Sequence, residues 1–129
     1  LADEKIIFAC VDSMEARRGI FENEAEHFSF FCDGRMAAEI CRILTADSGD
    51  KGSMDCYVNS LHTDEEALDE ACTAKSTCYC ACIAAGLMVA QFSKYLRSIP
   101  LFTPQIILNI LTAELVAEPP KPRKEVEKE

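Results

Sequence analysis

Short apolar runs separated by polar segments predict several buried β-strands along this chain. The first run, residues 5–11, is continuous rather than alternating, which is typical of a strand buried on both faces, as in a parallel sheet. Residues 28–32 predict a second buried strand, and Asp33-Gly34-Arg35 predicts the turn that ends it. Residues 37–45 predict another strand, although a helix also suits this segment. Further strands are expected over residues 54–61, 105–109 and 111–116.

The segment after the first strand carries a helical signal. Asp12 followed by Glu15 forms the carboxylate version of a capping box, which predicts a helix over residues 13–26. Apolar residues at helical spacing define its inner face, namely Ala16, Ile20 and Phe21. The charged residues expected to point outward are Arg17, Arg18, Glu22 and Glu24.

A longer helix is expected from about Cys72-Thr73 to Arg97, after an acidic run at residues 64–70. Residues 78–90 contain no charged side chain and are rich in Ala and Cys. This composition predicts the central buried helix of the domain, ended by Pro100. The uncharged stretch is shorter than the roughly 20 apolar residues that a membrane span requires.

Length and charge narrow the class of protein. The chain has 129 residues, which is enough for one domain, expected over residues 1–117. Residues 118–129 are rich in Pro and charge and predict a disordered tail. The net charge of −9 disfavours nucleic acid and anionic membrane surfaces as partners. The start at Leu1 has no secretory signal character, so we expect a cytoplasmic protein and an excised or trimmed piece of a longer one.

Eight cysteines raise the question of disulfides or metal. No pair has the C-x-x-C spacing of the common zinc and redox motifs. We therefore expect reduced thiols packed as small hydrophobic groups, and no zinc. A thiol redox or metal-storage protein is the alternative that the cysteine count leaves open.

Two single residues and a group of three arginines are candidates for chemistry. Asp12 follows a predicted buried strand and leads into a helix, where ligands bind in open α/β sheets, and a carboxylate there can hold Mg²⁺. The alternative is a helix cap without further function. Cys72 precedes the long helix, whose dipole favours a thiolate, while the acidic run at 64–70 opposes it. The forked side chains of Arg17-Arg18 and Arg35 suit phosphate or carboxylate. The alternative is a solvated helix face and a turn, and for Arg18 we favour this alternative.

Taken in order, three of these segments resemble the ThiF/MoeB/HesA superfamily of ubiquitin-activating-enzyme-like adenylyltransferases. The segments are Asp12-Ser13-Met14-Glu15-Ala16-Arg17, Asp33-Gly34-Arg35-Met36, and Cys72-Thr73 at the start of the long helix. The resemblance covers about residues 4–117, with Ser13 in place of the family's usual Asn. It implies that Asp12 binds the magnesium of ATP, that Arg17 also contributes to the nucleotide site, and that Cys72 accepts the activated carrier protein.

The resemblance also implies a fold and partners. The chain matches the C-terminal half of a Rossmann-like adenylation domain, an α/β fold with a mixed sheet and a long buried helix. The family's Gly-rich nucleotide loop and its zinc-binding cysteine pairs do not occur in this sequence. ATP and Mg²⁺ are therefore expected only together with the N-terminal half, and this piece alone is expected to be inactive.

The implied substrate is the C-terminal carboxylate of a ubiquitin-like or sulfur-carrier protein. A homodimer or heterodimer is expected, because a half-domain leaves a sheet edge bare. The alternative within the family is a non-catalytic scaffold or dimerisation subunit, in which Asp12 is a cap and Cys72 a packing residue.

Overall fold

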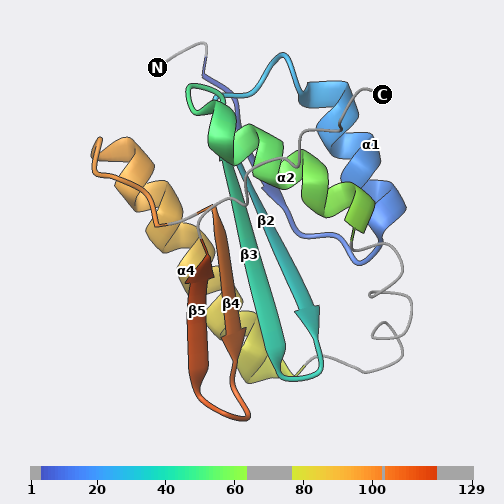
Figure 1. Cartoon of the computed structure of the whole chain (residues 1–129), viewed down its shortest axis with the longest axis vertical. Coiled ribbons are helices and arrows are strands. Elements are labelled where there is room, and N and C mark those ends of the chain that lie inside the picture. The colour runs from blue at the N-terminus through green and yellow to red at the C-terminus, as the bar shows by residue number, and fades with distance from the viewer. Residues whose placement is uncertain (1–3, 64–76, 103, 119–129) are drawn as a thin grey trace, which may run out of the picture.

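The structure is a computed structural model and describes residues 4–63, 77–102 and 104–118. It is a mixed α/β fold in which α1 and α2 cover one face of a five-stranded sheet and α4 covers the other (Figure 1). The elements are β1 (Ile6–Ala9), α1 (Met14–Glu24), β2 (Phe30–Ala37), β3 (Ile40–Asp47), α2 (Lys51–Thr63), α4 (Cys78–Leu96), β4 (Gln105–Asn109) and β5 (Glu114–Glu118). The α/β class is therefore confirmed. Cys72, the acidic run at 64–70 and the predicted tail beyond Glu118 lie outside the described residues.

The strands lie in sequence order across the sheet, β1-β2-β3-β4-β5. Only β1 and β2 run parallel in the part of the chain that the structure describes, with Ile6 beside Phe30 and Ala9 beside Asp33. They are joined through α1, as parallel neighbours must be joined by a crossover. β2 to β5 form an antiparallel meander, and β4 and β5 confirm the predicted final pair of strands, although β5 begins at Glu114 rather than at residue 111.

The first strand was expected to be buried on both faces, and this prediction is wrong. β1 lies at the edge of the described sheet, and Phe8 is 40% exposed. A continuous apolar run indicates burial but does not say which neighbours supply it.

β2 continues through the predicted turn. Asp33, Gly34 and Arg35 are strand residues and are buried. The chain turns only at residues 38–39, where Ala37 pairs with Ile40 and Ala38 has a φ of 52°. The charges of Asp33 and Arg35 are compatible with a buried strand because each has a partner, as described below.

The segment expected as a strand over residues 54–61 is helical and belongs to α2. Its apolar residues are Met54, Tyr57, Val58 and Leu61, which are three or four apart and so share one face of a helix. Asp50 immediately precedes the helix, and its carboxylate accepts a hydrogen bond from the Gly52 N–H at 3.0 Å. The helical spacing decides this segment, because an alternating strand would place Tyr57 and Val58 on opposite faces.

The start of α1 also differs from the expectation. Its N-cap is Ser13, whose Oγ accepts from the Ala16 N–H at 3.1 Å. Asp12 is therefore not the cap, and its side chain is exposed one residue before it. Arg17, expected to point outward, is 4% exposed and turns toward the sheet.

α4 is a covering helix rather than a central buried one. Its buried residues, Cys80, Ala84, Met88 and Gln91, define a single face against the sheet. Large apolar side chains on the rest of the helix are exposed, namely Tyr79, Ile83, Val89 and Leu96. The predicted end holds, because the helix stops at Leu96 and Ser98 closes it with a φ of 53°. The predicted start at Cys72-Thr73 lies outside the described residues, and Thr77 caps the described helix.

By length and composition, α4 is the one described helix that could cross a membrane. The same properties occur in helices that cover a soluble core, and α4 packs against β2 and β3. The cytoplasmic location stays a prediction.

Candidate functional site

The carboxyl end of β1 leads into an exposed loop that carries Asp12. Residues 10–13 connect Ala9, the last residue of β1, to Met14, the first residue of α1. Asp12 is exposed in this loop and lies next to the N-cap of α1. The carboxyl end of a parallel strand beside a helix N-terminus is the usual place for anionic ligands and their metal ions in α/β proteins.

Arg17 approaches the same loop from inside the protein. Its Nε donates to Asp33 Oδ1 at 3.0 Å, which forms a buried ion pair between α1 and β2. Its Nη2 donates to the Val11 carbonyl at 2.6 Å and to the Gly34 carbonyl at 3.4 Å. The guanidinium fork therefore binds a carboxylate and two backbone carbonyls, and its predicted role toward a cofactor stays a prediction.

Asp33 is the centre of this buried network. It has no exposed surface, and its two oxygens accept from three donors on three elements. Besides Arg17, the Arg35 Nε donates at 3.0 Å and the Tyr57 hydroxyl at 2.9 Å, both to Oδ2. Burial of a carboxylate is costly unless it is paired and hydrogen-bonded, and Asp33 meets both conditions.

The network continues to α2. The Arg35 Nη2 donates to Ser60 Oγ at 2.8 Å, and the Arg35 guanidinium lies 5.7 Å from the centre of the Tyr57 ring. Burial, and next the nearby charge of Asp33, raise the pKa of the Tyr57 hydroxyl well above its usual range. Tyr57 therefore remains a hydrogen-bond donor to Asp33 at any physiological pH. The network ties α1, β2 and α2 together beneath the Asp12 loop.

Arg18 was expected on a solvated helix face. It is only partly exposed, and its Nη2 donates to the Leu61 carbonyl of α2 at 3.0 Å. Both arginines of the Arg17-Arg18 pair thus contact the protein, although only Arg17 reaches the loop that carries Asp12.

Cys72 lies outside the described residues, so its distance from Asp12 stays open. The other seven cysteines are free thiols. Burial raises the pKa of Cys32 to about 12 and that of Cys41 to about 11. These two are therefore protonated at neutral pH and poor nucleophiles. Across residues 4–63, 77–102 and 104–118, no three Cys, His, Asp or Glu side chains lie close enough to hold a metal ion.

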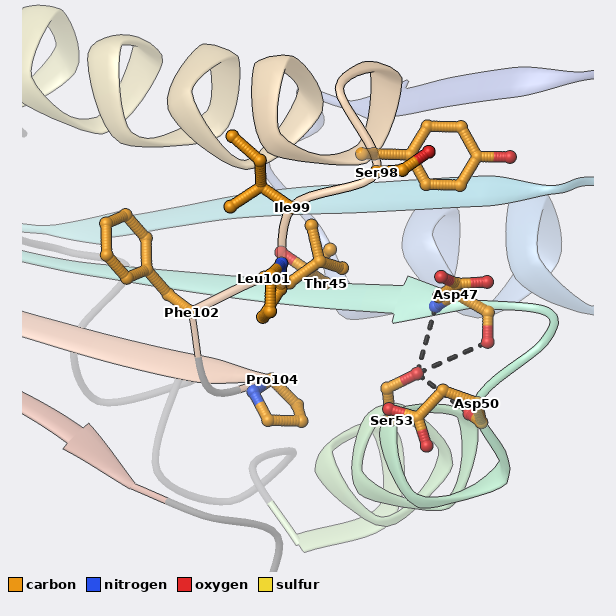
Figure 2. Close-up of a pocket in the computed structure, with 11 residues that line it drawn as sticks. Thr45, Asp47, Asp50, Ser53, Ser98, Ile99, Leu101, Phe102 and Pro104 are labelled. Atoms are coloured by element: carbon orange, nitrogen blue, oxygen red, sulfur yellow. Dashed lines mark hydrogen bonds between the residues drawn. The ribbon is translucent and has the colours of Figure 1, made fainter.

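A cavity of about 660 Å³ lies where the end of β3 and the start of α2 face the segment after α4 (Figure 2). Asp47, which lines it, pairs in the sheet with Phe30 beside the first residue of β1, so the cavity lies at the opposite end of the sheet from Asp12. The Ser53 Oγ accepts from the Asp47 N–H at 2.9 Å and lies 2.9 Å from the Asp50 carbonyl, to which it donates. The carboxylates of Asp47 and Asp50 repel an anionic ligand such as a nucleotide phosphate, so this cavity does not suit ATP.

The comparisons with known proteins do not extend this picture. No protein-family model matches the chain, and none of the curated proteins matches its sequence. The resemblance to the adenylyltransferase superfamily therefore depends on the quoted residues alone.

The buried network is not predictable as a unit from local sequence patterns. These patterns predict Asp33 and Arg35 in a turn, Tyr57 in a strand, and Arg17 on the outer side of its helix. One signal was available, because Phe31, Asp33 and Arg35 alternate along β2 and must share a face if the strand continues. Their partners on α1 and α2 are 16 and 24 residues from Asp33, and no local pattern identifies them.

Proposed function

We propose that this chain is one part of an ATP-dependent adenylation domain of the ThiF/MoeB/HesA type, which activates the C-terminal carboxylate of a ubiquitin-like or sulfur-carrier protein. The observation that carries the proposal is the place of Asp12, an exposed carboxylate at the carboxyl end of β1, beside the start of α1 and in the parallel part of the sheet. This is where the resemblance requires a magnesium ligand.

The residues present suit a shared magnesium site. Mg²⁺ is commonly held by one or two carboxylates together with substrate phosphates and waters. Asp12 supplies one carboxylate, and ATP would supply the phosphates. Bound Mg²⁺ would neutralise phosphate charge as the carboxylate of the carrier attacks the α-phosphate and pyrophosphate leaves.

Further residues must come from outside these 129. The chain contains no Gly-rich phosphate loop, and one carboxylate cannot replace backbone donors and cations around the phosphates. β1 pairs on one side only within the described sheet, so its other edge can accept a further strand. A Rossmann-like half joined at that edge would extend the parallel pair of β1 and β2, which is why we include this finer fold assignment in the proposal.

The test is ATP–pyrophosphate exchange by the intact enzyme, either the full-length protein or its complex, with a panel of ubiquitin-like and sulfur-carrier proteins. Asp12→Asn should lower exchange at least 100-fold, because it removes the magnesium ligand. Glu15→Gln is the matched control, since Glu15 is exposed one turn away in the first turn of α1 and its loss should change exchange less than twofold. Full activity of Asp12→Asn would refute the magnesium role, and robust exchange by the 129-residue chain alone would refute the need for a second half.

A scaffold or dimerisation subunit is the second candidate, and the outer surface of α4 favours it. Val89 and Leu96 are more than half exposed, and Tyr79 is nearly so. Apolar surface of this kind is typical of an interaction site. In a scaffold, both Asp12→Asn and Cys72→Ser would leave adenylation and transfer intact, whereas in the enzyme Asp12→Asn removes adenylation. The same pair of variants tests whether Cys72 accepts the carrier.

A further inference from the structure

The loop that carries Asp12 is held at two points. On one side, the Ser13 Oγ accepts from the Ala16 N–H and fixes the start of α1. On the other side, the Val11 carbonyl accepts from the Arg17 Nη2 at 2.6 Å. The carbonyl of Val11 and the nitrogen of Asp12 belong to one planar peptide unit. A hydrogen bond that fixes the Val11 carbonyl therefore fixes the plane of the peptide unit that ends at the Asp12 Cα, the atom to which the Asp12 side chain is attached.

Arg17 is itself held in one orientation. The guanidinium is planar, so its Nε bond to Asp33 and its Nη2 bond to Val11 constrain the same rigid group. Asp33 is in turn held by Arg35 and Tyr57 on the opposite oxygen. At 4% exposure, Arg17 is covered by the protein and does not present its charge at the surface where Asp12 lies.

We infer that Arg17 is a positioning residue, which orients Asp12 through the Val11 carbonyl and does not contact the nucleotide. This differs from the direct cofactor contact that the resemblance implies for Arg17. The effect of Arg17 on magnesium binding rests on the function proposed for Asp12, whereas the inference that Arg17 holds residues 10–13 in place does not.

Hydrogen exchange of the 129-residue chain, followed amide by amide, tests whether Arg17 holds the loop in place. Arg17→Gln removes the fork and should speed exchange at the amides of residues 16 and 17, which donate to the Ser13 Oγ and the Ser13 carbonyl, at least 10-fold relative to Phe21, further along α1. Ser60→Ala is the matched control, because Ser60 is a buried member of the same network that contacts Arg35 and not the loop. It should change all three amides by one common factor.

Arg17→Lys provides a second variant in case Arg17→Gln does not fold. It keeps the charge but cannot bind Asp33 and Val11 through one planar fork, so the same amides should again exchange faster than Phe21. If the amides of residues 16 and 17 in both folded variants follow Phe21 as they do in Ser60→Ala, the inference is wrong.

The second measurement is the magnesium requirement of ATP–pyrophosphate exchange by the intact enzyme. Arg17→Lys should raise the Mg²⁺ concentration for half-maximal exchange about 10-fold and leave kcat at saturating Mg²⁺ within twofold of wild type. Ser60→Ala should leave this concentration unchanged. If Asp12→Asn abolishes exchange but Arg17→Lys has a normal magnesium requirement, the positioning role fails and the proposed function stands. If the wild-type enzyme shows no exchange, the proposed function fails, and the amide data alone decide whether Arg17 holds the loop.

Discussion

The two faces of the sheet are covered by cores of different composition. Toward α1 and α2, the core combines an aromatic cluster that includes Phe21, Phe31 and Tyr57 with the ion network centred on Asp33, and Tyr57 belongs to both. Toward α4, the core consists of apolar side chains and sulfur, and its buried polar groups, Thr45 and Gln91, are uncharged. Figure 1 shows the corresponding layers, with α1 and α2 on one side of the sheet and α4 on the other.

This difference shows which face of the sheet depends on the geometry of its interactions and which depends only on the burial of apolar surface. Apolar burial is non-directional, so many side-chain arrangements would seal the α4 face equally well. Charged hydrogen bonds constrain angles as well as distances. These charged hydrogen bonds occur on the face covered by α1, which begins directly after the Asp12 loop. Arg17 connects the network to that loop.

The largest expected effect on stability is on the face covered by α1 and α2. Asp33→Ala leaves two buried guanidinium groups without their carboxylate and should lower the free energy of unfolding by about 3–5 kcal/mol. Urea unfolding at pH 7 measures it. Glu22→Ala, at an exposed position on α1, is the control and should stay within about 0.5 kcal/mol of wild type. A loss below about 1 kcal/mol for Asp33→Ala would mean that the network contributes little to stability.

The α4 face should respond to alkaline pH. In the unfolded chain thiols ionise near pH 9, whereas burial raises the pKa of Cys41 to about 11 and that of Cys32 to about 12. Above pH 9 the folded state therefore keeps protons that the unfolded state has lost. The free energy of unfolding falls as the pH rises, and the contribution of the two thiols is fully present below about pH 8. Each thiol contributes at most about 1.4 kcal/mol per pH unit, and the two together should lower stability by about 2 kcal/mol between pH 8.5 and 10.

Urea midpoints at the two pH values measure this fall, and Cys32→Ala and Cys41→Ala serve as controls. Each variant should remove about half of the pH dependence. An unchanged slope in both variants would assign the alkaline loss to other groups.

Packing on the α4 face is tested by Gly34→Ala. An added Cβ at Gly34 would lie 2.6 Å from the Met88 Sδ, which is closer than van der Waals contact allows. Met88 must then shift, and we expect a loss of about 1–2 kcal/mol in urea unfolding. The double variant Gly34→Ala/Met88→Ala should cost less than the sum of the single variants, because removal of the Met88 side chain removes the clash. Simple additivity would show that the two positions are not in contact.

The smallest expected effect has the opposite sign. Gly86 is exposed within α4, and an added Cβ there meets no atom within 4 Å. Gly86→Ala should therefore stabilise the protein by about 0.5–1 kcal/mol, since glycine is costly inside a helix. Thermal unfolding detects this as a higher Tm. A lower Tm would indicate that the outer side of α4 is packed against another surface.

The sequence by itself determined the α/β class, the helix after β1, the end of the long helix and the final pair of strands. Each follows from local features: apolar runs, the polar segment around residues 12–15, Pro100, and the polar Asn109, at which β4 ends. Local spacing also fits α2, since Met54, Tyr57, Val58 and Leu61 recur at helical intervals, and the strand expected over residues 54–61 is wrong.

Only the tertiary structure decided the course of β2 and the role of Arg17. Asp33-Gly34-Arg35 has the composition of a turn, yet it lies inside a buried strand because Arg17 and Tyr57 arrive from other elements to satisfy Asp33. For the same reason an arginine that an isolated helix would expose is buried. The composition of a segment predicts its structure when its own neighbours satisfy its charges, and it does not do so when the partners lie far away in the chain.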